Sequence, residues 1–276
     1  MRDLPTPTLP FATLTMPWRT SPPPPPPAEP AGLGFDVRWA RDEHELREAQ
    51  RLRHEVFAVE MGARLAPPAG TPAGHDADHL DPFCEHLLVR APGDGRRDGP
   101  VIGTYRVLTP EAAQRAGGFY SDTEFDLAPL GALRGRMVEL GRACVHAQWR
   151  SGSAILALWG ALAEFMQRNR LDVMIGCASI GMRDGGHAAA SLWERLRHSH
   201  LAAGEHRVRP WLPLPVQELR SNLAVEAPAL IKGYLRCGAK VLGAPAWDPD
   251  FNTADLPLMM RLQDLPARYR RHFLGA

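Results

Sequence analysis

The sequence lacks an excess of charge, a cysteine motif and a long apolar run. Its 276 residues hold 32 Lys+Arg against 31 Asp+Glu, a formal net charge of +1. Nucleic-acid-binding proteins usually carry a strong basic excess, so this class is not expected. The four cysteines lie far apart and form no C-x-x-C pair. This spacing argues against a zinc knuckle or a disulfide scaffold and favours reduced thiols.

Two further absences limit where the protein is expected to work. No apolar run approaches the roughly 18 residues of a membrane-spanning helix, and the N-terminus lacks the basic region and apolar core of a signal peptide. We therefore expect a cytoplasmic protein. His75, His79 and His86 lie near Cys84, but without the fixed spacing of a zinc site. Neither a metal ion nor a tightly bound cofactor is expected.

Proline marks the first boundary in the chain. Residues 1–33 contain the run Pro22 to Pro27 with further prolines on both sides, which excludes a helix and favours extended chain. We expect a disordered leader that is either a spacer or a docking motif for a proline-binding partner. Residues 34–264 are expected to form one domain. Residues 265–276, which include RYRRHF, are expected to form a basic tail that is solvated or touches a membrane surface.

Alternating strands and helices are predicted after the leader. FDVRWA, from Phe35, indicates a strand, Asp42 caps a helix that continues to Phe57, and HLLVRA with PVIGTYRVL indicates a hairpin. Short helices are expected after Pro110 and over 191–198. The later segment that begins APALIKGYLRC favours a helix, a glycine turn, a strand, a loop and a closing strand. This order indicates a single α/β or α+β domain with a mixed sheet.

The segment 137–180 is the most informative part of the sequence. It predicts a strand, a short turn of small residues, an amphipathic helix and a second strand, an arrangement typical of an acyl-transfer core. Alternation along the first strand buries Val138 and Leu140 and turns Glu139 and Arg142 toward a cleft. Glu139 is therefore the first candidate for chemistry.

Three spacings follow one another on the predicted elements. They are Arg53-x-x-x-Phe57, Asp76-x-Asp78-x-x-Asp81 and Glu139-x-x-Arg142, with Arg106 on the intervening strand. Their order resembles that of the acyl-homoserine-lactone synthases, a branch of the GNAT-like acyltransferase fold. Over about residues 35 to 262 the chain is more similar still to the ornithine N-acyltransferases, which are hemolysin-like GNAT relatives. The blocks that carry this similarity are GTYR, GGFYS-x-x-EFDL, VELGRACVH and KGYLRCGAKVLGAPAWDPDFNTAD.

The resemblance implies a GNAT-like acyl-CoA N-acyltransferase fold and an activity. Members move a 3-hydroxy fatty acyl group from the 4'-phosphopantetheine thioester of an acyl-carrier protein to the α-amino group of ornithine, giving lyso-ornithine lipid. Glycine, lysine or a polyamine remain alternative acceptors, and a catalytically silent GNAT-like binding protein is a second reading. The amphiphilic product makes peripheral contact with the inner membrane an expectation.

The chemistry assigns roles to the central residues. An amine that attacks a thioester must be deprotonated, and the carboxylate of Glu139 is the candidate base. Its alternative role is a structural ion pair with Arg142 or Arg106. Either arginine can hold the α-carboxylate of an amino acid. Backbone amides in the stretch 143–147 are expected to stabilise the oxyanion, because neighbouring parallel strands splay and leave donors unpaired.

Acidic side chains before the hairpin are the candidates for the substrate ammonium. Asp76, Asp78 and Asp81 are assigned to it, together with Arg53 and Phe57 as further acceptor-binding residues. The alternative for the three aspartates is a solvated loop or pairing with Arg53.

The turn RSGSAI before the central helix is the candidate donor site. Coenzyme-A enzymes usually show Q/R-x-x-G-x-G/A here, whereas Arg150, Gly152 and Ser153 offer room for one phosphate or a pantetheine arm, which favours a carrier-protein donor. Cys144 and Val145 are assigned to the donor side as well. Cys144 is either packed in the core or a thioester nucleophile. The apolar run from Ile155 can line an acyl tunnel or form core.

Overall fold

An eight-stranded sheet organises the chain, and the strand order is β1-β2-β3-β5-β6-β10-β8, with β9 paired to β10. The computed structural model describes residues 34–93, 98–150 and 152–274, so the predicted leader and part of the predicted hairpin turn lie outside the described residues. The strands are β1 (Asp36–Trp39), β2 (Glu85–Arg90), β3 (Val101–Leu108), β5 (Met137–Val145), β6 (Val173–Gly181), β8 (Lys240–Val241), β9 (Ala246–Asp248) and β10 (Thr253–Arg261). A second, two-stranded sheet joins β4 (Phe125–Asp126) to β7 (Arg209–Pro210).

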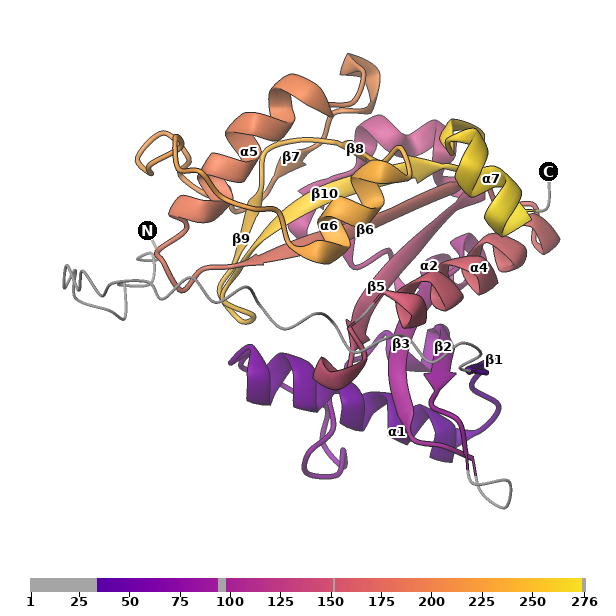
Figure 1. Cartoon of the computed structure of the whole chain (residues 1–276). Coiled ribbons are helices and arrows are strands. Elements are labelled where there is room, and N and C mark those ends of the chain that lie inside the picture. The colour runs from indigo at the N-terminus through magenta and orange to yellow at the C-terminus, as the bar shows by residue number, and fades with distance from the viewer. Residues whose placement is uncertain (1–33, 94–97, 151, 275–276) are drawn as a thin grey trace, which may run out of the picture.

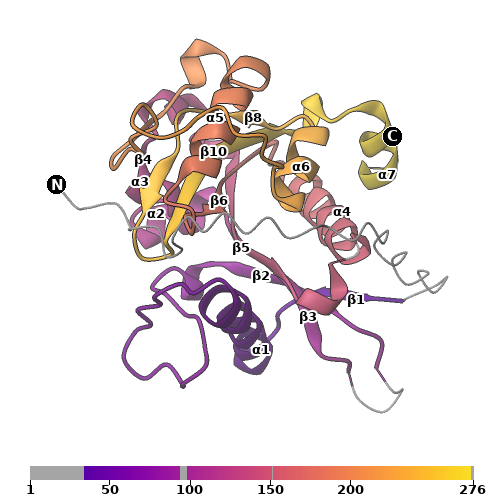
Figure 2. The ribbon, with the colours of Figure 1, turned by 60° about the vertical axis from the view of Figure 1, so that its left-hand side comes forward.

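Helices cover both faces of the large sheet. They are α1 (Glu43–His54), α2 (Pro110–Ala116), α3 (Ser121–Glu124), α4 (Ser153–Arg168), α5 (His187–Ser199), α6 (Ala229–Arg236) and α7 (Ala267–Leu274). Short 3-10 turns are η2 (Asp81–Phe83), η3 (Ala128–Arg136), η4 (Ala147–Trp149), η5 (Gly204–His206) and η6 (Leu262–Asp264). Figures 1 and 2 show α1 and α4 on opposite sides of β3. We call the two sides the α1 face and the α4 face.

The predicted elements of the first half are present. Asp42 caps α1, because its carboxylate accepts a hydrogen bond from the backbone N–H of Glu45 at 2.9 Å. The helix then widens into a π-helix, η1 (Glu55–Glu60), and so runs past the predicted end at Phe57. β2 and β3 pair antiparallel as the predicted hairpin.

Core packing follows the alternation of the strands. On the α4 face, Leu158 and Leu162 of α4 pack with Val107 and Val138, and all four are at most 3% exposed. The same face continues under α5 and α6, where Leu192 and Ile231 pack on β10. On the α1 face, Met137 and Ile175 pack beneath α2 and η3. Odd-numbered residues of β5 and β6 up to Ile175 therefore point to the α1 face, which places Glu139 there.

The parallel pair β5 and β6 is held over only three residues. Met137–Glu139 are in register with Val173–Ile175, and the strands part beyond that point. Gly176 marks the last close approach, since a Cβ built on it would lie 2.4 Å from the carbonyl oxygen of Leu140. The predicted splaying of the two strands is thus present, and it opens the middle of the sheet.

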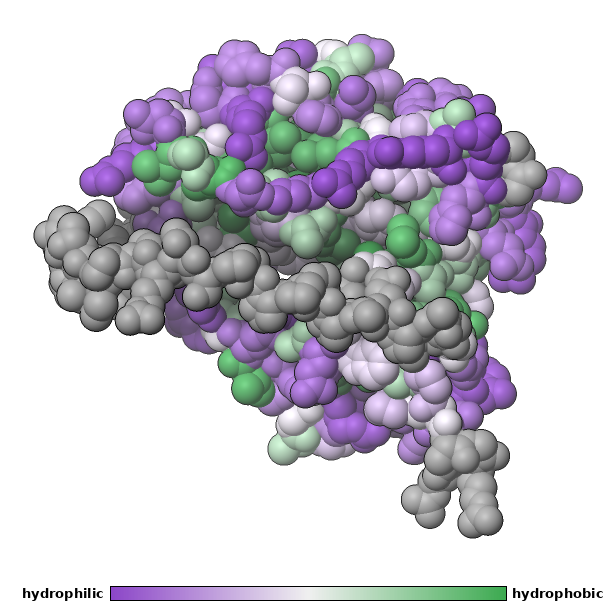
Figure 3. Space-filling model, in the orientation of Figure 1, coloured by the Kyte–Doolittle hydropathy of each residue, from purple (hydrophilic) through white to green (hydrophobic). Residues whose placement is uncertain are grey.

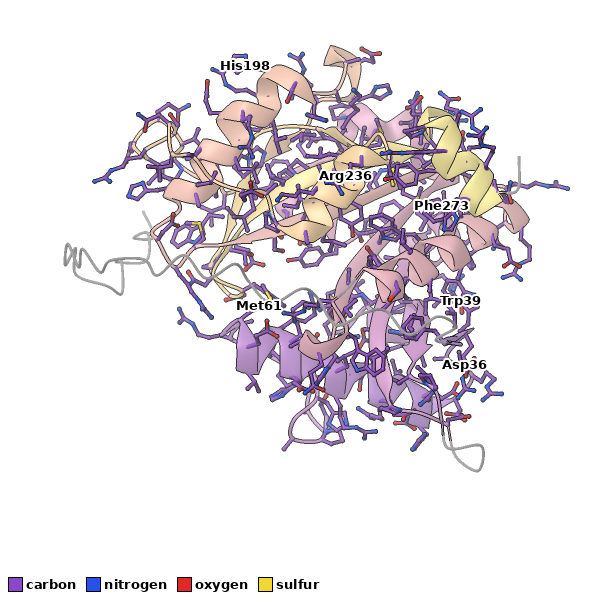
Figure 4. All side chains as sticks on the ribbon, viewed as in Figure 1. Asp36, Trp39, Met61, His198, Arg236 and Phe273 are labelled. Carbon is purple, nitrogen blue, oxygen red and sulfur yellow. The ribbon has the colours of Figure 1, made fainter. Side chains whose placement is uncertain are left out.

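The C-terminal segment differs from the expected basic tail. Residues Ala267–Leu274 form α7, which packs on α4, where the rings of Trp159 and Phe273 lie 6.5 Å apart, edge to face. Phe273 is labelled at this junction in Figure 4. Within the ranges given above, no helix is long and apolar enough to cross a membrane.

Candidate active site

A cavity of about 780 Å³ lies where β5 and β6 part, and residues from both faces of the sheet line it. This volume is in the range of small-molecule sites. Met61, after η1, and Arg236, on α6, both line it and lie on opposite sides of the gap in Figure 4. In Figure 3, hydrophobic residues gather in the hollow between the upper and lower parts of the molecule, while hydrophilic residues cover the outer rim.

The lining divides into two arms. The polar arm, on the α1 face, consists of Arg106, Tyr120, Glu139, Arg142, Asp248 and Asp255. The apolar arm, between α4, α6 and α7, consists of Ile155, Leu156, Trp159, Ile231, Tyr234 and Tyr269. The two arms meet at the gap between β5 and β6.

Glu139 lies at this meeting point, and its carboxylate is held by three donors. Its Oε2 accepts the backbone N–H of Tyr120 at 2.6 Å, and its Oε1 accepts the backbone N–H of Ser121 at 2.7 Å and the Ser121 hydroxyl. These contacts fix the start of α3 against β5. The side chain is 4% exposed, yet it lines the cavity.

Burial controls the protonation of Glu139. Loss of solvent raises the pKa of its carboxyl group, and the hydrogen bonds from Ser121 and Tyr120 oppose this change without cancelling it. Neither Arg142 nor Arg106 forms an ion pair with Glu139, so the structural pairing considered from the sequence is not the observed one. Its role as a base stays a prediction.

Beneath the polar arm, three arginines and three aspartates form one network. Arg53, which is 0% exposed, donates from Nε to Asp76 at 2.8 Å and from Nη1 to Asp81 at 3.0 Å. Gln50 donates to the second oxygen of Asp81 at 2.8 Å. Asp76 and Asp81 are buried, at 1% and 4% exposure, so the solvated-loop reading fails for them, while the pairing with Arg53 is observed.

The network extends to the cavity through two arginines. Arg106 contacts both oxygens of Asp78 at 2.6 Å, and Nη2 of Arg142 donates to Asp78 at 3.0 Å. Burial alone would raise the pKa of Asp78, but the two guanidinium groups outweigh it and hold the pKa well below its usual range. All three predicted ammonium ligands are therefore already compensated by arginine.

Arg142 reaches this network because β5 is irregular. The β3–β5 register shifts between Thr104 and Arg106, and Arg142 has a φ of 49°, in the left-handed region. Its guanidinium lies 4.6 Å from the ring of Phe251, which meets Phe57 edge to face at 6.1 Å. Arg142 and Phe57 line the cavity, and their binding of substrate stays a prediction.

On the donor side, Arg150 is already engaged. Its guanidinium pairs with both carboxylate oxygens of Glu60 at 2.5 and 2.7 Å, and its Nε donates to the carbonyl of Val145 at 2.9 Å. A donor phosphate would compete with Glu60 for this side chain. Gly152 has a φ of 106° and precedes the first turn of α4, which begins at Ser153. Arg150, Gly152 and Val145 line the cavity.

Cys144 packs with Leu52 and Val56 of the α1 region. Burial raises the pKa of its thiol to about 12, so the thiol stays protonated near neutral pH. This favours the packing role over the nucleophile considered from the sequence. In the part of the chain that the structure describes, no three His, Cys, Asp or Glu side chains are grouped as metal ligands.

Aromatic residues shape the apolar arm. Trp159 of α4 stacks on Tyr234 of α6 at 5.5 Å and donates from Nε1 to the hydroxyl of Tyr105 at 3.3 Å, and the two tyrosine hydroxyls are hydrogen-bonded. Gly233 lets the indole approach, since a Cβ there would lie 2.4 Å from the Trp159 ring. The apolar run of α4 thus divides into core residues and residues that line the cavity.

Sequence reasoning missed four residues of the polar arm and its surroundings. They are Tyr120, Ser121, Asp248 and Asp255. The blocks GGFYS and AWDPDFNTAD contain them, so their polar character within apolar surroundings was the available signal. Their position against Glu139 depends on how α3 and β9–β10 fold back over the sheet, and local patterns do not encode this.

Comparisons with known proteins show what the chain is similar to. A family model described as an acetyltransferase (GNAT) domain matches residues 52–160. An L-ornithine N(alpha)-acyltransferase of Rhodobacter capsulatus is 37% identical over 255 residues, which cover 88% of this chain and 96% of that protein. One of Agrobacterium fabrum is 37% identical over 254 residues, covering 87% and 85%. Among solved structures, the AHL synthase LasI has a TM-score of 0.52 at 14% identity and covers 89% of this chain and 97% of its own, a likeness that shows the fold alone.

Proposed function

The chain belongs to the L-ornithine N(alpha)-acyltransferase family, an acyltransferase family with the GNAT fold, and we propose that it acylates the α-amino group of L-ornithine to give lyso-ornithine lipid. The donor would be a 3-hydroxyacyl group on the phosphopantetheine arm of an acyl-carrier protein. The family, the fold and the enzyme class that the resemblance implied are confirmed. The carrier-protein donor and the lyso-ornithine lipid product are proposals.

The observation that carries the proposal is one cavity with two chemically different arms. A fatty acyl chain fits an arm walled by Ile155, Leu156 and Trp159, because burying its methylenes gains about 0.8 kcal/mol each. An amino acid carries charges and fits the polar arm. The arms meet beside Glu139, so a thioester carbonyl and an amine can be brought together there.

On the acceptor side, two charged groups of β5 have complementary tasks. The guanidinium of Arg142, which lies over Phe251, can hold the α-carboxylate of the amino acid. Glu139, three residues earlier, can take a proton from the α-ammonium, directly or through a water, because its raised pKa brings it nearer to working pH. The freed amine then attacks the thioester carbon.

On the donor side, the attack forms a C–N bond and an oxyanion, and collapse breaks the C–S bond. The thiolate leaves and takes up the proton that the amine nitrogen loses. Backbone amides of β5 beyond Glu139, where β6 no longer pairs with it, are the donors available to the oxyanion. The start of α4 at Gly152 offers amides to a single phosphate, which suits a carrier protein better than coenzyme A.

Acylation assays test the proposal. Purified protein is given one 3-hydroxyacyl chain as the carrier-protein thioester or as the coenzyme-A thioester, with ornithine, lysine, glycine or putrescine, and products are read by mass spectrometry. We expect N-acyl ornithine from the carrier-protein donor. Nα-acetylornithine is the matched control and should stay unreacted, because its α-amine is blocked. If another amine is acylated and no acyl ornithine forms, ornithine is not the acceptor. If the coenzyme-A thioester reacts faster than the carrier-protein thioester, the carrier protein is not the preferred donor.

The apolar arm gives a separate prediction about chain length. In Gly233→Ala the new methyl group would lie 2.4 Å from the Trp159 ring, so the indole must move and the arm narrows. We expect kcat/KM to fall about tenfold for long acyl donors and much less for short ones. Gly131→Ala is the matched control, since no atom lies within 4 Å of the added Cβ. An equal fall in kcat/KM for long and short donors would show that the acyl chain does not bind in the apolar arm.

A further inference from the structure

Besides Glu139, two carboxylates of the polar arm form no ion pair with an arginine. Asp248 on β9 and Asp255 on β10 line the cavity and are 6% and 3% exposed. Asp255 accepts hydrogen bonds from the hydroxyls of Thr253, at 2.9 Å, and Ser179. Within the described residues, no Lys, Arg or His forms an ion pair with either aspartate. Asp248 accepts the backbone N–H groups of Asp250 and Phe251 and the Tyr120 hydroxyl, and Arg142 attracts Asp255 without pairing with it. A buried carboxylate usually has a cationic partner, and these two have hydrogen bonds but no paired cation.

The pKa values of carboxyl groups in and near the polar arm show the same lack of positive charge. Burial, followed by repulsion from Asp248, raises the pKa of Asp255 to about 6. Burial, followed by repulsion from Asp255 and Asp248, raises the pKa of Glu124 to about 7. Asp76, Asp78 and Asp81 differ because arginines already neutralise them. A cation that enters the cavity therefore gains most beside Asp248 and Asp255.

The strand register places these carboxylates on the same face as Glu139. Asp255 lies opposite Ser179 and Asp248 lies opposite Thr253, while Glu139 lies opposite Ile175. Residues two apart on a strand share a face, so Ile175 and Ser179 point the same way. All three carboxylates therefore face the α1 side. Figure 1 shows β9 and β10 side by side, where they pair antiparallel.

Tyr120 sets the separation between the two ends of the arm. Its backbone N–H donates to Glu139 at 2.6 Å, and its hydroxyl lies 3.2 Å from Asp248. One tyrosine residue therefore spans the distance between these carboxylates. Two amines joined by four carbons are about 6 Å apart when extended. With a hydrogen bond at each end, such a molecule bridges the two carboxylates along the tyrosine.

We propose that Asp248 and Asp255 bind the side-chain ammonium of the acceptor amino acid and so select ornithine over neutral amino acids. This inference rests on the proposed function. The α-amine is then at Glu139, the α-carboxylate at Arg142, and the aliphatic chain lies along Tyr120. A neutral side chain leaves both carboxylates without a counter-charge and is disfavoured.

Ornithine and norvaline test this assignment, since norvaline has the same carbon chain without the terminal amine. Asp255→Asn and Asp248→Asn keep the size of the side chain and an acceptor oxygen. In each variant we expect the ratio of kcat/KM for ornithine to kcat/KM for norvaline to fall about 30-fold or more. Asp250→Asn is the matched control, because Asp250 is exposed in the same loop and does not line the cavity. It should leave the ratio unchanged.

A variant that is damaged in its fold gives a different result from a variant that has lost selectivity. A misfolded variant loses both reactions equally and keeps the ratio, and thermal unfolding detects it. An unchanged ratio in folded Asp255→Asn and Asp248→Asn, with ornithine acylated by the unaltered protein, would overturn this inference and leave the proposed function intact. If the unaltered protein does not acylate ornithine at all, the proposed function itself fails.

Discussion

Glu139→Gln is expected to lower kcat by about 10²-fold or more, because an amide cannot accept the proton that the α-ammonium must lose. The measurement is steady-state acylation of ornithine with the variant confirmed as folded. A rate within a few-fold of the unaltered protein would assign Glu139 to holding Tyr120 and Ser121 in place. This alternative is concrete, since three donors contact its carboxylate.

Ser121→Ala is the control that separates the two roles. It removes the Ser121 hydroxyl from Glu139 and leaves the carboxylate and both backbone donors. If Glu139 is the base, Ser121→Ala should lose only a few-fold in kcat while Glu139→Gln loses about 10²-fold, and similar losses in the two variants would indicate a scaffold role.

The dependence of kcat/KM on pH is a further test of Glu139. Burial raises the pKa of Glu139, and the base works only when ionised, so kcat/KM should rise with pH through a value above the ordinary carboxyl value of about 4.3. Glu139→Gln should remove the part of the acid limb that Glu139 sets, while the part set by Asp255, whose pKa is raised to about 6, should remain.

Arg53→Met is expected to destabilise the fold by about 3–5 kcal/mol, the usual loss when one partner of a buried ion pair is removed. Asp76 and Asp81 stay buried in this variant. As charged partners, Asp76 keeps Arg142 and Asp81 keeps Arg106, and Asp81 also keeps its hydrogen bond from Gln50. Urea unfolding followed by circular dichroism measures the loss. The effect should change little with salt, because water does not reach the pair.

Arg51→Met is the matched change on the same helix. Arg51 is exposed, and surface substitutions of this kind usually change the stability by less than about 0.5 kcal/mol. Equal losses in the two variants would show that the Arg53 network does not hold α1 against the sheet.

Local patterns predicted the elements well. Asp42 has the cap geometry that its side chain favours, and strand, turn, helix and strand occur over 137–180 as predicted. These features depend on neighbours in the sequence. The alternation that buries Val138 and turns Glu139 toward a cleft is observed for the same reason.

Contacts between distant segments were not predictable in this way. Arg142 meets Asp78 only because β5 has a bulge with a left-handed residue, and no residue type there indicates it. Asp248 and Asp255 lie on the same side of the sheet as Glu139 only because β10 pairs with β6 and β9 pairs with β10. The basic residues after 265 read as a tail, yet Tyr269 and Phe273 give α7 an apolar side that packs on α4.

The gap between β5 and β6 has a consequence for how the proposed product departs. In the proposed binding mode, the amino acid and the fatty chain would meet from opposite faces of the sheet, so neither would have to pass the other on the way in. The product would then lie across the sheet, with its charged head beside Asp248 and Asp255 and its tail between α4 and α6. It would have to leave by one of these two faces, and one of its ends would then have to pass through the gap.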